Sequence, residues 1–166
     1  MIQVTQPIMV LNEEICKSNI ARMSAKASAA RVDFRPHFKT HQSREIGEWF
    51  RACGVDKITV SSLDMALQFA EWGWEDITVA FPVNCLEQEK INQLAARIQL
   101  NLLLVHSEGV RQLSACLKYP VGVYLGVDTG YHRDGVDANN YEKIGRIMDI
   151  VAPDVNMKFE GFLTHA

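Results

Sequence analysis

The sequence predicts an α/β protein that forms part of a TIM (β/α)8 barrel, with about six parallel barrel strands preceded by a short extra strand and a helix. Three observations favour this fold class. The segments GVDKITVSS and GWEDITVAF, which begin at Gly54 and Gly73, are near copies of one another. Short β-branched runs alternate with stretches of helical periodicity, as in proteins with parallel sheets. Polar residues follow the ends of several strands, where barrels build their sites.

The chain is expected to divide into an N-terminal unit, residues 1–30, and a part that carries the barrel strands, residues 31–166. A short strand is expected at residues 8–11 of the first unit. A helix should follow, with Asn12 at its N-terminal cap. The residues at helical spacing that mark this helix are Cys16, Ile20, Met23 and Ala27.

Six strand-like runs are expected in the barrel part. They fall at residues 32–35, 58–61, 77–81, 100–105, 121–127 and 158–164. Apolar residues recur at helical spacing in four of the intervening stretches, at residues 46–53, 91–98, 110–117 and 144–151. Gly54 and Gly73 stand where a helix can end, because glycine readily adopts the left-handed conformation of a C-terminal cap.

An open, doubly wound sheet is the alternative α/β architecture. Its nucleotide-binding versions carry GxGxxG or GxxxxGK after a strand, and this sequence has neither motif. The barrel is therefore favoured. A closed barrel needs eight strands and this chain supplies six, which would leave two unpaired strand edges. We therefore expect the chain to be the N-terminal part of a longer protein.

Composition and charge exclude several classes of partner. The net charge is −3, and no basic stripe runs along any segment, so neither a nucleic acid nor an anionic membrane is indicated. No signal peptide and no apolar stretch long enough to span a bilayer is evident, which predicts a cytoplasmic protein. The four cysteines are widely spaced without a CxxC motif, as is typical of reduced thiols.

The segment RPHFKTHQS, from Arg35 to Ser43, places His37, Lys39 and His41 at every second position. On a strand, these three side chains would point to one face, here the mouth of the barrel. Positive neighbours and partial burial favour the neutral form of a lysine, and a neutral amine can attack a carbonyl to form a Schiff base. Sugar-phosphate aldolases and pyridoxal phosphate enzymes both use this chemistry. A solvated surface lysine is the simpler alternative.

Four motifs in order along the chain favour the second of these enzyme classes: PxxVLNxxxxxxNIxRM from Pro7, RPHFKTHQS, VDTGYHRDGV and GFLTHA. Together they resemble the alanine racemase-like fold (fold type III) of pyridoxal phosphate enzymes, over essentially the whole chain. RPHFKTHQS is most similar to the D-threonine aldolase and D-serine dehydratase branch, since alanine racemases proper usually carry Ala-Asn-Ala-Tyr after the lysine. The resemblance implies a truncated alanine racemase N-terminal-type domain, without the end of the barrel and the C-terminal β-domain.

The same resemblance implies pyridoxal 5'-phosphate as the cofactor and assigns five site residues. Lys39 matches the lysine that holds the cofactor covalently and moves the α-proton of the substrate. Arg133 matches the arginine that contacts the phenolic oxygen of the cofactor, and His165 matches the histidine that packs against its pyridine ring. His37 and His41 match motif positions near the cofactor.

The resemblance implies an enzyme that acts on a D-amino acid, in this branch a β-hydroxy one. D-threonine aldolase-type cleavage is the leading expectation, with D-serine dehydration and amino-acid racemization as alternatives. A non-catalytic pyridoxal phosphate-binding protein and an inactive fragment are alternatives of another kind. A homodimer is implied, because the family is commonly dimeric.

The chain departs from the family pattern at Gly126, and it lacks the domain that carries the metal ligands in the branch it resembles. Many alanine racemases position the arginine with a modified lysine seven residues before it; Gly126 stands there in this chain, so Arg133 must be held in another way. No metal site is predicted among these residues. In the branch that the motifs resemble, the metal ligands lie in the C-terminal β-domain, so any divalent metal would be bound there.

Overall fold

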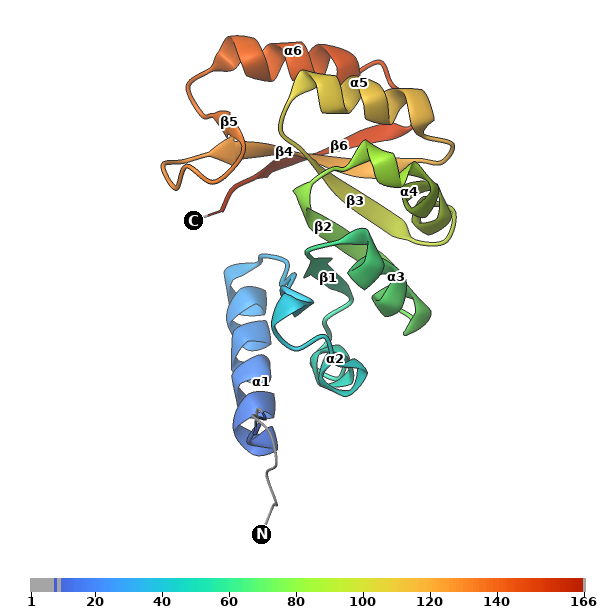
Figure 1. The fold of residues 1–166 in the computed structure, drawn as a ribbon. Coiled ribbons are helices and arrows are strands. Elements are labelled where there is room, and N and C mark those ends of the chain that lie inside the picture. Colours follow the sequence, from blue (N-terminus) through green and yellow to red (C-terminus); the bar gives the residue numbers. More distant parts are fainter. Residues whose placement is uncertain (1–7, 9, 166) are drawn as a thin grey trace.

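The computed structural model describes residue 8 and residues 10–165 of the 166-residue chain. Strands and helices alternate through most of its length (Figure 1). The α-helices are α1 (Glu13–Ala30), α2 (Arg44–Arg51), α3 (Leu63–Glu71), α4 (Gln88–Ala95), α5 (Ser107–Cys116) and α6 (Tyr141–Val151). Two short 3-10 helices are η1 (Phe38–Thr40) and η2 (Cys85–Glu87). The strands are β1 (Lys57–Val60), β2 (Asp76–Pro82), β3 (Gln99–Leu104), β4 (Val121–Asp128), β5 (Val136–Asp137) and β6 (Met157–Leu163).

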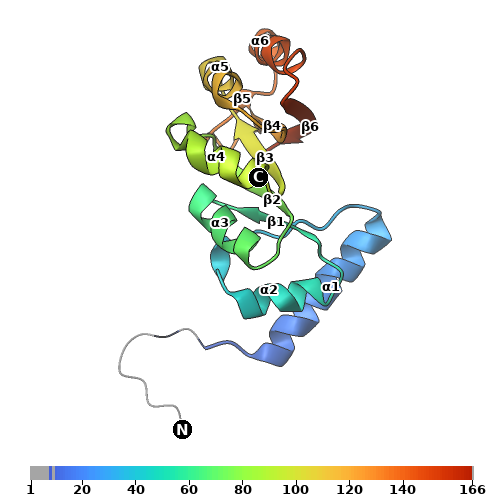
Figure 2. The same cartoon turned by 90° about the vertical axis from the view of Figure 1, so that its right-hand side faces the viewer.

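The main sheet is parallel and sequential. Strand β1 pairs with β2, β2 with β3, β3 with β4, and β4 with β6, all in parallel. Helices α3 to α6 connect these strands and lie along one face of the sheet (Figures 1 and 2). A doubly wound sheet would reverse its strand order and carry helices on both faces. The observed order is that of a partial TIM barrel, so the predicted fold class is confirmed.

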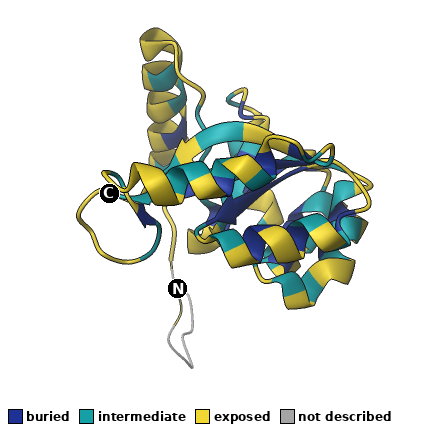
Figure 3. Ribbon diagram, turned by 90° about the horizontal axis from the view of Figure 1, so that it is seen from above, coloured by how far each residue is buried: buried dark blue, intermediate teal, exposed yellow. Residues whose placement is uncertain are grey.

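The core lies between the sheet and its helices. Alternate strand residues such as Ile58, Ile77 and Leu100 are fully buried and face helix residues such as Leu94 and Leu113. Burying one side chain of this kind contributes about 1.5–3 kcal/mol, so this layer supplies much of the free energy of folding. Figure 3 shows the result, with buried strands under helices whose outer surfaces are exposed.

The opposite, concave face of the sheet carries the intervening residues, and several are polar. Thr78 and Asn101 are almost fully buried there. Gly122 lies beside Asn101, and a β-carbon at Gly122 would lie 2.0 Å from Oδ1 of Asn101. The absence of a side chain at Gly122 is therefore what makes room for the Asn101 amide on this face.

The prediction of a strand at residues 32–35 is wrong. These residues have no regular structure, and the chain turns into η1 immediately afterwards. A short contact with the sheet remains, because the amide of Thr59 donates to the carbonyl of Pro36 at 2.8 Å and His37 forms an isolated parallel bridge with Thr59. Pro36 has no amide hydrogen to donate, which limits any longer ladder at this edge.

The other strands and helices predicted in residues 31–166, and the helix after Asn12, are present, with ends that shift by a few residues. The two-residue strand β5, which pairs with the end of β4, is an addition that periodicity does not predict. Gly54 and Gly73 have φ of 80° and 84°, as expected of residues that end helices. None of the helices in the described part of the chain is long and apolar enough to cross a membrane.

Helix α1 stands apart from the layered part of the structure (Figure 1). Its predicted cap is confirmed, since Oδ1 of Asn12 accepts the amide hydrogen of Ile15 at 3.0 Å. Ile20 is its buried residue, and the Ser24 hydroxyl donates to the carbonyl of Cys53 at 2.8 Å. Of the strand predicted at residues 8–11, residue 9 lies outside the described residues and the other three are not in a strand. The division at residue 30 stays a prediction.

Candidate functional site

The segment that carries Lys39 is fixed by Phe38. The Phe38 side chain is 0% exposed, and its ring lies 5.1 Å from each of the rings of Phe50, Phe69 and Trp74. Because Phe38 turns into the core, the next residue of η1 turns outward, and Lys39 is exposed. The partial burial expected for Lys39 on a strand is therefore wrong, although the lysine does reach the C-terminal end of the sheet.

A cavity of about 270 Å³ lies on the concave side of the sheet, beside Lys39. Its lining includes four of the five predicted site residues together with hydroxyl and apolar groups from the strands. The principal lining residues are His37, Lys39, Ser61, Leu103, Arg133 and His165. Residues separated by more than 120 positions in the sequence thus meet at one end of the partial barrel, as predicted for strand C-termini.

His37 links the turn to the cavity. Its Nδ1 accepts the amide hydrogen of Lys39 at 3.3 Å, so this imidazole caps η1. Burial lowers the pKa of His37 below its ordinary value, and the positive charges of Lys39 and Arg133 lower this pKa further. The lowered pKa favours the neutral form of His37, which can serve as a hydrogen-bonding group in the cavity.

His41 does not line this cavity. The expectation that His37, Lys39 and His41 share one face is wrong, because the 3-10 turn replaces the strand alternation on which it depends. The His41 ring lies 4.5 Å from the ring of Phe38 and stacks on Phe50 at 5.9 Å. Its Nδ1 accepts the amide hydrogen of Ser43 at 3.1 Å, and burial lowers its pKa.

Arg133 follows a tightly bonded loop at the end of β4. Asp128, the last residue of that strand, accepts hydrogen bonds from the amides of Gly130 and His132 at 2.9 and 3.0 Å. These bonds, with one to the His132 ring, lower the pKa of the Asp128 carboxyl to about 2. Arg133 itself contacts Asp134, with Nε 3.8 Å from the carboxylate.

His165 comes from the other side of the cavity, two residues after β6 ends. Its ring lies 4.6 Å from the ring of Tyr131, with an angle of 34° between their planes. The hydroxyls of Thr129 and Thr164 lie 2.9 Å apart and join the β4 loop to the end of β6. These contacts hold the Arg133 loop and His165 on the same rim.

One lining residue was missed as a site residue by the sequence analysis. Arg35 reaches the cavity and makes two hydrogen bonds to Asp76, at 2.7 and 3.0 Å. Asn101 donates to the same carboxylate at 2.9 Å. The signal available was the motif RPHFKTHQS itself, in which Arg35 stands four residues before Lys39.

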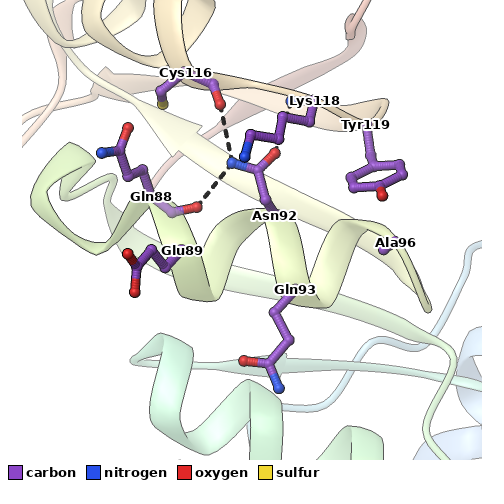
Figure 4. Close-up of a pocket in the computed structure, with 8 residues that line it drawn as sticks. All are labelled: Gln88, Glu89, Asn92, Gln93, Ala96, Cys116, Lys118 and Tyr119. Carbon is purple, nitrogen blue, oxygen red and sulfur yellow. Dashed lines mark hydrogen bonds between the residues drawn. The ribbon is translucent and has the colours of Figure 1, made fainter.

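A larger hollow of about 470 Å³ lies beside helix α4 (Figure 4), and none of the predicted site residues lines it. Asn92 of α4 spans it, donating to the carbonyls of Gln88 and Cys116 at 2.9 Å and accepting the amide hydrogen of Lys118 at 2.7 Å. The Asn92 amide therefore joins two elements of the fold. Across residues 8 and 10–165, no group of three His, Cys, Asp or Glu side chains is placed to hold a metal ion.

Comparison with known proteins identifies the family of the chain. The sequence model described as "Alanine racemase, N-terminal domain" matches residues 11–166, nearly the whole chain. The chain belongs to this family. Membership of the alanine racemase N-terminal domain family implies pyridoxal phosphate as the cofactor, and confirms the resemblance carried by the four motifs.

Two curated relatives are similar to nearly the whole chain. The chain is 34% identical to D-threo-3-hydroxyaspartate dehydratase of Delftia sp. (strain HT23), over 96% of this chain and 43% of the relative. It is 25% identical to D-serine dehydratase of Dictyostelium discoideum, over 96% of this chain and 44% of the relative. The chain thus spans less than half the length of these curated relatives.

Solved structures give the same picture of the fold. The structure of the Delftia dehydratase matches with a TM-score of 0.88 at 30% identity, covering 93% of this chain and 42% of that one. D-threonine aldolase from Filomicrobium marinum matches with a TM-score of 0.85 at 22% identity, covering 92% and 42%. The second similarity is evidence for the fold alone.

Proposed function

We propose that this protein is a pyridoxal phosphate-dependent lyase that acts on a β-hydroxy D-amino acid, with Lys39 as its catalytic residue. The observation that carries the proposal is the meeting of Lys39, Arg133 and His165 at one cavity in a chain that is 34% identical to a D-threo-3-hydroxyaspartate dehydratase. The activity is proposed for the whole protein. The curated relatives are more than twice as long as the chain described here.

The residues around the cavity suit the chemical groups of pyridoxal phosphate. An aldehyde needs a primary amine, which Lys39 supplies, and an anionic ring oxygen needs a cation, which Arg133 supplies. The flat imidazole of His165, which contacts Tyr131, offers a surface for an aromatic ring. His37 favours its neutral form, so it adds a hydrogen-bonding group without a further charge.

The chain's own residues divide the work as follows. The bound cofactor supplies an electron sink for the bond that is broken at Cα of the substrate. Nζ of Lys39, held at the rim by η1, accepts the α-proton. In an elimination this proton would balance the β-hydroxide that leaves, so that one molecule of water is lost. The Arg133 guanidinium holds an anionic oxygen, and its fixed positive charge restrains protonation of neighbouring groups. Because Lys39 approaches from one side, removal of the α-proton is expected to be specific for one enantiomer.

Elimination of water is the reaction that we favour. The two relatives of highest identity named above are both dehydratases of β-hydroxy D-amino acids, at 34% and 25% identity. The aldol cleavage expected from the motif is the second candidate, because a D-threonine aldolase shares the fold at 22% identity. Racemization stays the third. A homodimer, a cytoplasmic location and a metal held outside these residues stay predictions.

The first test is covalent labelling. The protein is mixed with pyridoxal phosphate, reduced with borohydride, and digested for peptide mass spectrometry. We expect one adduct at Lys39, and its loss in Lys39→Ala. Lys118→Ala is the matched control, since Lys118 is an exposed lysine that does not line the Lys39 cavity. Label spread over surface lysines, with Lys39 no more reactive than Lys118, would contradict the proposal.

The second test uses D-threonine, because each candidate reaction gives a different product. Elimination yields 2-oxobutanoate and ammonia, aldol cleavage yields glycine and acetaldehyde, and racemization at Cα yields L-allo-threonine. D-serine and D-threo-3-hydroxyaspartate are assayed in parallel for their oxo acids. Formation of oxo acid supports the dehydratase proposal. Cofactor binding at Lys39 with no product from any of the three would instead favour a non-catalytic pyridoxal phosphate-binding protein.

A further inference from the structure

The loop that carries Arg133 is closed on itself by Asp128. This carboxylate accepts three hydrogen bonds: from the amides of Gly130 and His132, and from Nδ1 of the His132 ring at 2.8 Å. Strand β5 then returns to the end of β4, pairing Val136 with Val127. The loop therefore leaves the sheet and comes back to it within a few residues.

Where the loop returns to the sheet, its backbone lies against the backbone of β4. Gly135 has φ of 103°, and a β-carbon there would lie 2.8 Å from the amide nitrogen of Asp128. The loop backbone thus packs directly on the end of β4. Its remaining freedom lies between Asp128 and Gly135, in the segment that includes Arg133.

His132 is held in an uncommon conformation at the centre of this segment. Its φ is 59°, in the left-handed region that residues other than glycine seldom adopt, although histidine does so more often than most. The His132 side chain is 82% exposed, so packing does not hold the ring. The bond from Nδ1 to Asp128, whose side chain is 20% exposed, is the contact that fixes it.

Arg133 depends on its backbone for its place. Its side chain is 41% exposed, and the carboxylate near it within the described part of the chain is that of Asp134, at 3.8 Å. Gly126 on β4 has no side chain that could hold the guanidinium, and a β-carbon there would lie 3.0 Å from Cγ1 of Val105. A larger side chain at that position would fit only if the side chains of Val105 and Leu103 shifted.

We propose that Asp128 and His132 are positioning residues that lock the loop so that Arg133 points into the Lys39 cavity. This inference rests on the proposed function, because it assigns Arg133 the task of binding the anionic oxygen of the cofactor. Asp128 fixes the start of the loop through two amides, and the His132 ring fixes the residue that immediately precedes Arg133. The exposed imidazole thereby acts on the site through its neighbour, without touching the cavity.

The test is a double-mutant cycle between His132 and Arg133, read as the dissociation constant for pyridoxal phosphate from tryptophan fluorescence. We expect His132→Ala to weaken binding about tenfold, the size of one hydrogen bond to a charged group. His132→Asn should restore binding to within about threefold, because asparagine keeps a side-chain donor and tolerates positive φ. In an Arg133→Ala background, His132→Ala should have no further effect.

Two further variants separate the ring from other causes. His132→Gly relieves the positive φ but lacks the ring, so we expect it to bind as weakly as His132→Ala. Asn139→Ala, an exposed change between β5 and α6, is the matched control and should bind as the unaltered protein does. Amide hydrogen exchange gives a second readout, in which the two amides that bond Asp128, those of Gly130 and of residue 132, lose protection in His132→Ala.

Three results would contradict the positioning role of His132. Unchanged binding in His132→Ala, or an equal loss in the Arg133→Ala background, would overturn the positioning role. Full recovery in His132→Gly would also overturn it, because strain at φ would then be the cause. If the unaltered protein forms no Lys39 adduct, the proposed function fails instead. The loop lock is then decided by exchange at the amides of Gly130 and residue 132, where unchanged protection in His132→Ala refutes it.

Discussion

The Arg35 guanidinium donates two hydrogen bonds, 2.7 and 3.0 Å long, to the Asp76 carboxylate on the concave face of the sheet. The pair joins the segment that precedes η1 to the first residue of β2, 41 positions away along the chain. Both side chains are largely shielded, 20% and 19% exposed, and Asn101 donates to the same carboxylate. The lysine-bearing turn is thus tied to the sheet by a fork that only arginine can make.

Removing this fork should destabilise the protein. We expect Arg35→Lys to lower the free energy of unfolding by about 1–3 kcal/mol, because a lysine cannot bond both carboxylate oxygens in one plane. Arg35→Met should cost about 3 kcal/mol, since it leaves a shielded carboxylate without its cation. Urea unfolding followed by circular dichroism measures both.

The control for this change is a solvent-exposed pair of similar length. Arg146 of α6 bonds Glu142 at 2.8 Å, but both side chains are well exposed. Arg146→Met should change the free energy of unfolding by less than about 0.5 kcal/mol. Equal losses in Arg35→Met and Arg146→Met would show that the Arg35 fork adds nothing beyond a surface ion pair.

Replacing glycine by alanine usually raises the free energy of unfolding, but at Gly122 we expect the same change to lower it. A β-carbon there would meet Oδ1 of Asn101 at 2.0 Å, and Asn101 is held by its bond to Asp76. We expect Gly122→Ala to destabilise by about 1–3 kcal/mol through overpacking. Gly145→Ala, in helix α6 with open space around it, should instead stabilise by about 0.5–1 kcal/mol. Chemical unfolding of the two variants compares them directly, and stabilisation of both would refute the overpacking.

Sequence patterns predicted the layered part of the fold well, because apolar periodicity records which face of an element is buried. The near-copied segments at Gly54 and Gly73 do begin equivalent strands, and Asn12 caps α1 as its residue type predicts. What a periodic pattern cannot report is a partner far along the chain. Arg35 was read as the end of a strand, although its side chain is committed to Asp76 on β2.

The turn around Lys39 shows a second limit. Alternation of His37, Lys39 and His41 fits a strand, but Pro36 removes a ladder donor and Phe38 enters the aromatic core, so the backbone coils into η1. Motif resemblance placed His37, Lys39, Arg133 and His165 near one another, and the structure brings these four to one cavity. Their roles toward a cofactor stay predictions. His41 was grouped with them by the same motif and by the strand alternation, and the structure places it outside the cavity.

The two shielded histidines predict how stability varies with pH. Burial lowers the pKa of His41 and of His37 below the ordinary value of 6.5. Between the folded pKa and 6.5 the unfolded state therefore binds more protons, so the free energy of unfolding falls as pH falls through that window. Above about pH 8, where the histidines of the unfolded chain are also neutral, the two residues should contribute almost no slope.

Replacing each histidine by asparagine tests this pH dependence. Asparagine does not titrate, and its Oδ1 can replace Nδ1 as acceptor for the Ser43 amide at position 41. We expect the slope of unfolding free energy against pH, measured in urea from pH 5 to 8, to decrease in His41→Asn and in His37→Asn, and to decrease most in the double variant. A slope that persists unchanged in the double variant would assign the effect to other groups.

Phe38 makes the strongest prediction about how the fold serves the site. Its fully buried ring contacts Phe50, Phe69 and Trp74, and it is the residue of η1 that directs Lys39 outward. Phe38→Ala should cost about 3–5 kcal/mol, from lost transfer energy and the cavity that remains. Phe162→Ala, which removes an exposed ring on β6, should cost less than about 1 kcal/mol.

Phe38→Leu keeps much of the volume, so it should fold under mild conditions while holding the turn less firmly. In that variant we expect slower labelling of Lys39 by pyridoxal phosphate at equal folded fraction, measured by mass spectrometry after borohydride reduction. Labelling at the rate of the unaltered protein would mean that the position of Lys39 is set by His37 and Arg35, without the aromatic anchor.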